Sequence, residues 1–380
     1  MIIIIFLPNT TMDDSSAIII DNGSYMIRAG LASANCYYHT TFPTIISRPK
    51  CHNSYGHNEK EYYVGKEAEE KKRAVFKSSS PIKNGEITDW DDMGKIWDYT
   101  FNDQLCIAPE EHPVLMTEPS NNSKSCREKM AQIMFETYNV PSFYTQIPAI
   151  LALFASGRTT GCVVDCGYNT SHVIPVYEGY SLPNNITRLD VRGKDMDEYL
   201  ETKLYEQNNL EETYDTSHFR RMKEECCYVS MDIEREEDIP ERSYEMPDGK
   251  RVYIKKERVC VPEILFGLSM RDNSLHGGIH QATCQTISKC NEDLHRELFS
   301  NIVLAGGSTK FPGFRERMQK EVESFSPSNM KTAVYSFPEP DCMAWRGGAM
   351  FSSLSSFRNM WISREEYDEY GPGIISKICF

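Results

Sequence analysis

The chain has 380 residues, of which 40% are hydrophobic and 25% charged, as is usual for a globular protein of about two domains. Acidic residues (55) outnumber basic ones (41), and the resulting net charge of −14 argues against nucleic acid as a direct partner. The 13 cysteines show no paired CxxC spacing, which favours reduced thiols in a cytosolic or nuclear protein.

The first apolar segment, Ile2 to Leu7, has no basic residue before it and is followed at once by Pro8. It lacks the cleavage site of a signal peptide and is too short to cross a membrane. No later apolar run approaches membrane length. We therefore expect no membrane span, and we interpret residues 1–11 as either an added contact arm or the product of an upstream start.

A strand, a tight turn and a second strand are predicted around Asp21. Ile18 to Ile20 form a short apolar run that is typical of a buried strand. Asn22 and Gly23 predict a two-residue hairpin turn, because both positions tolerate positive φ, and Tyr25 to Ile27 return as the second strand. Such a turn directs backbone N–H groups at one point, which suits phosphate. An ordinary surface hairpin is the alternative for this segment taken alone.

The same layout recurs between Val163 and Val176, where Asp165 ends an apolar strand and small residues follow it. A third segment, Leu304 to Thr309, places a glycine pair after an apolar strand and before a helical pattern. The repeat predicts two similar half-domains that face each other across a cleft. Asp21 and Asp165 would then lie where a phosphate-bound Mg²⁺ and its waters need oxygen ligands.

Long runs spread along the chain resemble actin. They include Asp89 to Met93, Ala108 to Pro113, Gln132 to Thr137, Ala155 to Gly161 and Glu366 to Asp368. The resemblance implies an α/β fold of the actin/Hsp70-type ATPases, with two similar domains (four subdomains) around a nucleotide cleft. The expected outer domain is 1–155 plus 343–380, with 43–80 as its small lobe. The expected inner domain is 156–342, with 192–274 as its small lobe.

The resemblance also implies ATP or ADP in the cleft, together with Mg²⁺ or Ca²⁺. Asp21 and Asp165 would hold the metal through waters and, with His172, would form the catalytic group. The residues expected to contact the nucleotide are Asn22, Gly23, Ser24, Tyr25, Arg28, Cys166, Gly167, Tyr168, Asn169, Gly193, Asp195, Lys223, Glu224, Gly306, Gly307, Ser308, Lys310, Phe311 and Asp341.

Some departures from the actin pattern fall on catalytic and phosphate positions. Pro148 stands where actins have the glutamine that orients the attacking water, and proline has no side-chain donor or acceptor. Gln146 would have to reach the water from another direction. Tyr25 replaces a glycine, and Tyr168 and Asn169 replace an aspartate and a glycine. Two interpretations stay open: the tyrosines crowd the phosphates, or they turn outward and leave the backbone cradle intact.

Further departures surround the expected nucleotide. Arg28 replaces a lysine that reaches the phosphates and keeps its charge, and Asn84 replaces a histidine near them. On the adenine side, Lys310 and Phe311 replace a methionine and a tyrosine, and Asp341 replaces a lysine. We expect adenosine to be held more weakly than in actin.

Two segments that join subunits in an actin filament are also altered. The polar run Cys51 to His57 replaces apolar residues in an insert predicted to be a surface loop. The plug, Gly267 to Gly278, carries Arg271 and Asp272 where apolar residues would be buried. A contact without apolar surface lacks its main driving force. By contrast, an apolar groove that would take a partner's helix is kept, formed by Phe154, Tyr180, Met350, Phe351, Leu354 and Met360.

The sequence therefore predicts a divergent cytoskeletal protein of the actin family, with weakened ATP hydrolysis and self-polymerisation. It would serve as a nucleotide-binding structural subunit of a filament or fixed assembly, beside other actin or actin-like subunits. The expected location is the cytoplasm and its cytoskeleton, including axonemal or nuclear complexes. A conventional dynamic actin ATPase is the alternative, and a small-molecule kinase of the same superfold is a more distant one.

Overall fold

One mixed sheet is built from strands near the start of the chain and one strand near its end. In spatial order these strands are β19 (Ile362–Ser363), β10 (Ser142–Gln146), β9 (Val114–Thr117), β1 (Ile18–Asn22), β2 (Met26–Leu31) and β3 (Thr40–Pro43). The hairpin β1–β2 is antiparallel, whereas β9 and β10 run parallel to β1. The computed structural model in which this is seen describes residues 16–32, 39–50, 60–71, 75–208, 214–236, 238–268 and 277–379.

A second mixed sheet repeats this arrangement. Its strands, in spatial order, are β13 (Tyr180–Ser181), β12 (Ser171–Tyr177), β11 (Gly161–Cys166), β17 (Ile302–Ala305) and β18 (Val334–Tyr335), with β14 (Thr187–Leu189) also paired to β12. Here β11 and β12 form the antiparallel hairpin, and β17 and β18 continue in parallel. The strand–aspartate–turn–strand repeat in the sequence thus corresponds to two sheets of the same topology.

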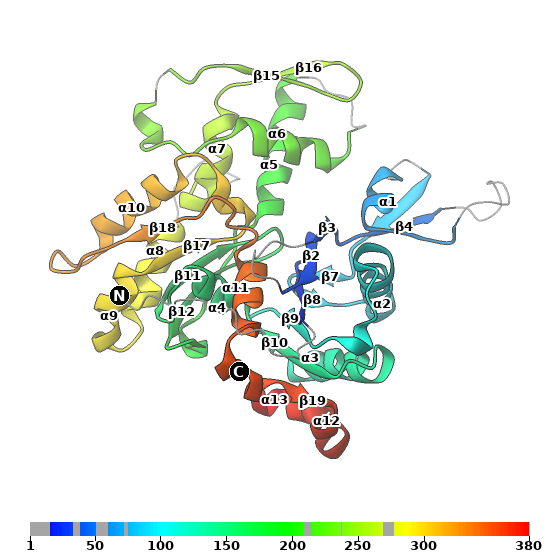
Figure 1. The fold of residues 1–380 in the computed structure, drawn as a ribbon. Coiled ribbons are helices and arrows are strands. Elements are labelled where there is room, and N and C mark those ends of the chain that lie inside the picture. Colours follow the sequence, from blue (N-terminus) through cyan, green and yellow to red (C-terminus); the bar gives the residue numbers. More distant parts are fainter. Residues whose placement is uncertain are drawn as a thin grey trace.

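Two helices pack against each other between the sheets (Figure 1). Helix α11 (Met343–Ser352) contacts β1, β2 and β9, and helix α4 (Pro148–Ala155) contacts β11 and β17. The indole N–H of Trp345 donates to the carbonyl of Ile19 (3.0 Å), which ties α11 to the first sheet. Pro148 occupies the first turn of α4, where its missing N–H leaves no helical bond unmade.

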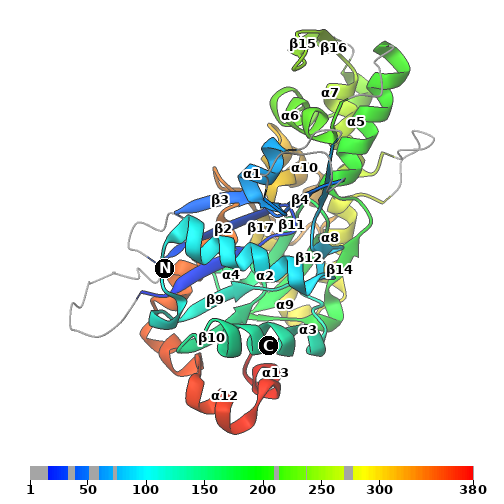
Figure 2. The same ribbon diagram turned by 90° about the vertical axis from the view of Figure 1, so that its right-hand side faces the viewer.

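The remaining helices cover the outer faces of the sheets and form the peripheral lobes. They are α1 (Gly65–Glu70), α2 (Trp90–Asp98), α3 (Lys124–Gln132), α5 (Gly193–Asn208), α6 (Thr216–Cys226), α7 (Glu257–Glu263), α8 (Ile279–Ser288), α9 (Glu292–Ser300), α10 (Phe314–Phe325), α12 (Arg364–Tyr370) and α13 (Ile375–Ile378). Figure 2 shows α2 on the outer side of the first sheet, where Met93, Ile96 and Trp97 join its core. On the far side of the second sheet, α8 contacts β12 and α9 contacts β11.

Small sheets complete the structure. β4 (Ile46–Pro49), β5 (Tyr63–Val64) and β6 (Phe76–Ser79) form one, and β7 (Ile82–Lys83) pairs with β8 (Glu86–Ile87) in another. The hairpin of β15 (Arg242–Glu245) and β16 (Arg251–Ile254) lies beyond α5, α6 and α7 at the top of Figure 1. None of the helices in the described part of the chain is both long and apolar enough to cross a bilayer.

Three segments singled out in the sequence lie outside the described residues. They are the N-terminal residues 1–11, the run from Cys51 to His57, and residues 269–276 of the plug.

The turn between β1 and β2 differs from the predicted two-residue hairpin. Asn22 still belongs to β1 and pairs with Ile27, and neither Asn22 nor Gly23 has positive φ. Gly23 is needed because the chain approaches it closely: a Cβ there would lie 2.4 Å from the carbonyl oxygen of Met26. The predicted turn geometry was therefore wrong, although the hairpin itself is present.

His280 gives the second half of the molecule a predicted acid sensitivity. Its imidazole is 6% exposed, and its centroid lies 6.1 Å from that of Phe266 and 5.3 Å from that of Phe325. Burial lowers the pKa of His280, and Arg317 lowers it further while Glu321 opposes the shift. Because the unfolded chain takes up a proton that the folded chain resists, acidification below a pH of about 6.5 should destabilise the fold.

Replacing His280 by phenylalanine should reduce the loss of stability on acidification, because residue 280 then takes up no proton on unfolding. The measurement is the urea midpoint of both proteins at neutral pH and at about pH 5.5. Equal acid-induced changes in the two midpoints would show that His280 is not the source.

Candidate functional site

A cavity of about 640 Å³ lies between the two sheets and is lined by both hairpin turns. This volume is within the range of small-molecule and cofactor sites. Asp21, Gly23 and Ser24 enter from the first hairpin, and Asp165 and Gly167 enter from the second. The two similar sequence segments therefore meet at one site, as the repeat predicted.

The carboxylate of Asp21 is held at the base of the cavity by groups of the first sheet. Thr117, at the end of β9, donates its hydroxyl to Asp21 Oδ1 (3.0 Å) and accepts from the backbone N–H of Asn22 (2.8 Å). Arg28 on β2 lies 3.6 Å from the other carboxylate oxygen. Parallel strands β1 and β9 end side by side, and this is why a threonine distant in sequence reaches Asp21.

Asp165 and His172 are cross-strand partners at the end of the β11–β12 hairpin. Burial, together with the negative charge of the nearby Asp21, raises the pKa of Asp165 to about 7, since two close carboxylates disfavour a second negative charge. The pKa of Asp21 is also raised, chiefly by burial. Burial lowers the pKa of His172 to about 4, so its imidazole is neutral near pH 7.

Gly306 allows a third segment to approach the carboxylates. Its φ is +84°, and a Cβ there would lie 2.4 Å from the carbonyl oxygen of Cys166 and 2.7 Å from Asp165 Oδ1. Only glycine fits this combination of left-handed backbone and close contact. A Cβ on the next residue, Gly307, would meet open space, so this part of the loop is free to lie against a ligand.

Pro148 lines the cavity, but the side chain of Gln146 is directed elsewhere. Gln146 is 5% exposed, and its Oε1 accepts from the backbone N–H of Ile147 (2.8 Å), just before α4 begins. With its side chain turned toward Ile147, Gln146 is not among the residues that line the cavity. The structure therefore does not support the alternative that Gln146 orients the water in place of a glutamine at position 148.

An ion-pair chain crosses the cavity. Arg28 on the first sheet donates to Asp341 Oδ2 (2.7 Å), and Lys310 lies 2.7 Å from Asp341 Oδ1. The segment before Asp341 is anchored to the second sheet, because Gly306 donates its N–H to the carbonyl of Pro340 (3.0 Å). Arg28 and Lys310 together lower the pKa of Asp341 despite its burial, so this carboxylate is ionised.

The tyrosines at the turn tips do not point outward. Tyr25 and Tyr168 both line the cavity, with ring centroids 4.9 Å apart. The guanidinium of Arg220, on α6, lies 4.1 Å from the centroid of Tyr25 and 4.2 Å from that of Tyr168. The two interpretations left open by the sequence are thus decided in favour of tyrosines inside the cleft.

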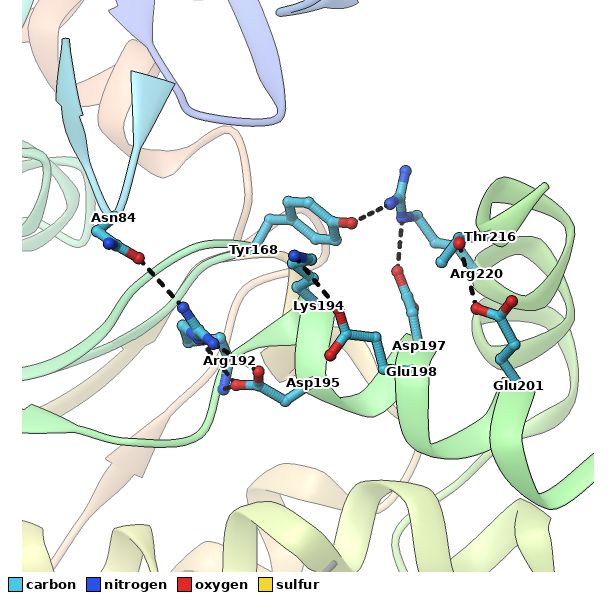
Figure 3. A network of polar contacts seen from close by, with 10 residues as sticks. All are labelled: Asn84, Tyr168, Arg192, Lys194, Asp195, Asp197, Glu198, Glu201, Thr216 and Arg220. Carbon is cyan, nitrogen blue, oxygen red and sulfur yellow. Dashed lines mark hydrogen bonds and ion pairs between the residues drawn. The ribbon is translucent and has the colours of Figure 1, made fainter. Parts of the chain in front are cut away.

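Figure 3 shows the polar network around Tyr168. Arg220 donates to the Tyr168 hydroxyl and, through Nε, to Asp197 on α5 (2.9 Å). At the near end of α5, Arg192 donates to Asn84 (3.2 Å), at the turn between β7 and β8. Contacts made by the protein itself therefore join the two sides of the cleft.

Lys223 and Glu224 lie on α6 beside Arg220 and also line the cavity. Lys223 Nζ donates to the carbonyl of Gly193 (3.0 Å) and lies 2.5 Å from Asp197 Oδ1. Burial raises the pKa of Glu224, partly offset by Lys223 and Arg220.

Most of the residues expected at a ligand do line this one cavity. They are Asp21, Asn22, Gly23, Ser24, Tyr25, Arg28, Pro148, Asp165, Gly167, Tyr168, Gly193, Lys223, Glu224, Gly306, Gly307, Ser308, Lys310, Phe311 and Asp341. Cys166, Asn169, His172 and Asp195 are not among the lining residues. Asp195 instead accepts from the backbone N–H and the guanidinium of Arg192.

The cavity is also lined by three residues that no sequence pattern had indicated: Thr117, Glu118 and Arg220. Arg220 precedes Lys223 by one helical turn, so helical spacing alone places the two on the same face. Thr117 and Glu118 follow an apolar run that forms a strand next to β1, and strand ends are where ligands meet α/β sheets.

Some residues of the apolar groove predicted to bind a partner's helix are buried in the hydrophobic core. Phe351 is 7% exposed and packs against Phe154 (4.9 Å between centroids) and Phe357 (4.3 Å), whereas Tyr180 is 58% exposed. Leu354 and Met360 are partly buried against the first core.

These observations define a class of protein: an α/β chain built on a repeated sheet, with an aspartate from each copy facing one ligand-sized cleft. The chain belongs to the actin family, because the family model described as Actin matches residues 12–380. The resemblance inferred from sequence runs is thereby confirmed over nearly the whole chain.

Proposed function

We propose that the cleft binds an adenine nucleotide, ATP or ADP, between an outer domain (1–155 with 343–380) and an inner domain (156–342). Membership of the actin family supports this proposal, since family members generally bind such a nucleotide with a divalent cation. The observation that carries it is the meeting of Asp21, Asp165 and the turns at Gly23 and Gly167 around one cavity. Lys223, Glu224 and the loop at Gly306 would hold the sugar and base.

The carboxylate pair fits a hard divalent cation such as Mg²⁺ or Ca²⁺. Burial and the negative charge of Asp21 both disfavour ionisation of Asp165, and a bound cation would offset both effects. No group of three or more His, Cys, Asp or Glu side chains able to hold a metal occurs in the described part of the chain. Asp21 and Asp165 would therefore act on the ion through water, with phosphate oxygens as the remaining ligands. The bound ion would supply charge neutralisation at the phosphates.

We further propose that the protein is a structural subunit of a filament or fixed assembly, with weak hydrolysis and weak self-polymerisation. The support is Pro148 in the cavity wall, together with a Gln146 side chain that is bonded to Ile147. Its partners would be actin or actin-like subunits and helix-bearing proteins at the groove of Tyr180, Phe154 and Leu354. The cytoplasmic cytoskeleton, including an axonemal or nuclear complex, is the proposed location.

The nucleotide content of the purified native protein tests this function. Denaturation releases any bound nucleotide, and chromatography identifies it. Stoichiometric adenine nucleotide supports the proposed binding, and ATP in particular supports impaired hydrolysis. Stoichiometric ADP with rapid phosphate release would instead favour a dynamic filament ATPase. A protein that carries no nucleotide and binds none on addition would refute the proposal.

Replacing Pro148 by glutamine should increase ATP turnover by roughly tenfold, because the new amide can orient a water toward the terminal phosphate. Steady-state phosphate release measures the change. Pro148→Ala is the matched control, since it removes the ring without adding an amide. Equal rates in the two variants would show that the missing amide does not limit hydrolysis.

A further inference from the structure

The tips of the two equivalent turns are closed by aromatic rings. Tyr25 follows Ser24 in the first turn, and Tyr168 follows Gly167 in the second. Their rings contact each other across the cleft, with centroids 4.9 Å apart and planes inclined by 42°. Each ring is partly buried, and both border the cavity. The space between the turn tips is therefore filled by side chains of the protein.

Arg220 completes this group, and we name Tyr25, Tyr168 and Arg220 the clasp. Its guanidinium lies about equally far from both rings, at 4.1 and 4.2 Å, which is within the range of cation–π contacts. It donates to Asp197 and to the Tyr168 hydroxyl. Burial lowers the pKa of Arg220, but Tyr25, to which it is also hydrogen-bonded, and Asp197 raise it by more. Donors used in this way are not free for an anionic ligand.

The phenols of the clasp carry no charge at neutral pH. Burial, partly offset by Arg220, raises the pKa of Tyr168 to about 12, and burial likewise raises the pKa of Tyr25. The clasp is thus a neutral aromatic pair with one cation, and that cation is balanced by Asp197, whose side chain is fully buried.

The other cations that line the cavity are also paired with carboxylates. Among the lining residues described, the cations are Arg28, Lys223, Arg220 and Lys310, and each lies within ion-pair distance of a carboxylate. The carboxylates of Asp21, Glu118, Asp165, Glu224 and Asp341 outnumber them. Each added phosphoryl group must therefore compete with protein carboxylates for the cations, or rely on a metal ion.

We propose that the clasp fills the place of a terminal phosphoryl group and makes the cleft selective for a nucleoside diphosphate over a nucleoside triphosphate. This inference rests on the proposed nucleotide site and specifies its ligand. A diphosphate reaches the turn backbone at Gly23 and Gly167 without displacing the rings. A triphosphate needs further space at the turn tips, which the two rings fill. It also needs further hydrogen-bond donors there, and those of Arg220 already bond to the protein.

Calorimetric titration of the nucleotide-stripped, full-length protein with ADP and with ATP, in excess Mg²⁺, tests the proposal. We expect ADP to bind at least about tenfold more tightly than ATP. Tyr25→Gly and Tyr168→Gly should each lower this ratio, mainly by strengthening ATP binding. Tyr177→Ala is the matched control. Tyr177 lies on β12, the strand that follows the turn of Tyr168, is 37% exposed and does not border the cavity.

The phenylalanine variants separate the rings from their hydroxyls. Tyr25→Phe and Tyr168→Phe keep the rings in place, so they should retain most of the selectivity. Should a glycine variant fail to give a cooperative thermal transition, Tyr25→Ala carries the same test.

Each outcome has one meaning. Equal or tighter binding of ATP by the unmodified protein would overturn the selectivity but leave the nucleotide site in place. A preference for ADP that is unchanged in folded Tyr25→Gly and Tyr168→Gly would overturn the role of the clasp. Failure to bind either nucleotide would refute the proposed function itself, and the selectivity with it.

Discussion

Asp21→Asn is expected to weaken the binding of Mg²⁺-nucleotide by roughly a hundredfold. Asp21 supplies one of the two carboxylates at the base of the cavity, and it lies next to Arg28 at 3.6 Å. Asparagine keeps an oxygen that can accept from Thr117, so the local hydrogen bonding should survive. The charge that would attract a divalent cation is lost. The effect should therefore fall on metal-dependent binding rather than on folding.

Calorimetric titration of each protein with nucleotide, with and without Mg²⁺, measures this effect. Asp190→Asn serves as the control, because Asp190 is exposed after β14 and does not line the cavity. Thermal melting of both variants checks that they are folded. A folded Asp21→Asn protein with unchanged Mg²⁺-dependent affinity would exclude Asp21 as a metal-site residue.

Gly347→Ala is expected to destabilise the protein by about 3 kcal/mol or more. Gly347 lies on α11 where that helix packs against α4 between the two sheets. A Cβ there would lie 1.8 Å from the carbonyl oxygen of Leu151. Backbone cannot give way as a flexible side chain can, so the helices would have to separate and expose apolar surface on both sides.

Gly94 provides the matched comparison within the same fold. It also lies in a helix, α2, but a Cβ there would meet nothing within 4 Å. Gly94→Ala should therefore stabilise the protein by up to about 1 kcal/mol, through the better helix propensity of alanine. Urea unfolding of both variants gives the two free-energy changes. A similar, small effect at both positions would show that the α4–α11 contact is not as close as described.

Several elements could be predicted from the sequence because short-range patterns determine them. The apolar runs before Asp21 and Asp165 form strands, and a helix follows the glycine pair at Gly306. The repeat of strand, aspartate and turn also predicted one shared site. These features depend on residues that are neighbours along the chain, so the pattern contains the needed information.

The conformation of the turns was harder to predict from the sequence. Asn22-Gly23 has the composition of a two-residue hairpin turn, yet that turn forms at Asn84-Gly85, where both residues have positive φ (52° and 89°). At Gly23 the close approach of the Met26 carbonyl controls the conformation instead. Pairing with neighbouring strands on both sides of β1 fixes where the strand ends, and local preference yields to it.

The sequence by itself determined the family, the α/β character, the repeated hairpins and the presence at position 148 of a proline, which has no side-chain amide. The tertiary structure alone decided where the tyrosines point, which charges pair and which residues share the cleft. Tyr25 meets Tyr168, and Arg28 meets Asp341, only because two separate sheets are packed face to face through α4 and α11. Such contacts join segments far apart in the chain, and their distances depend on the packing of the whole fold rather than on any local pattern.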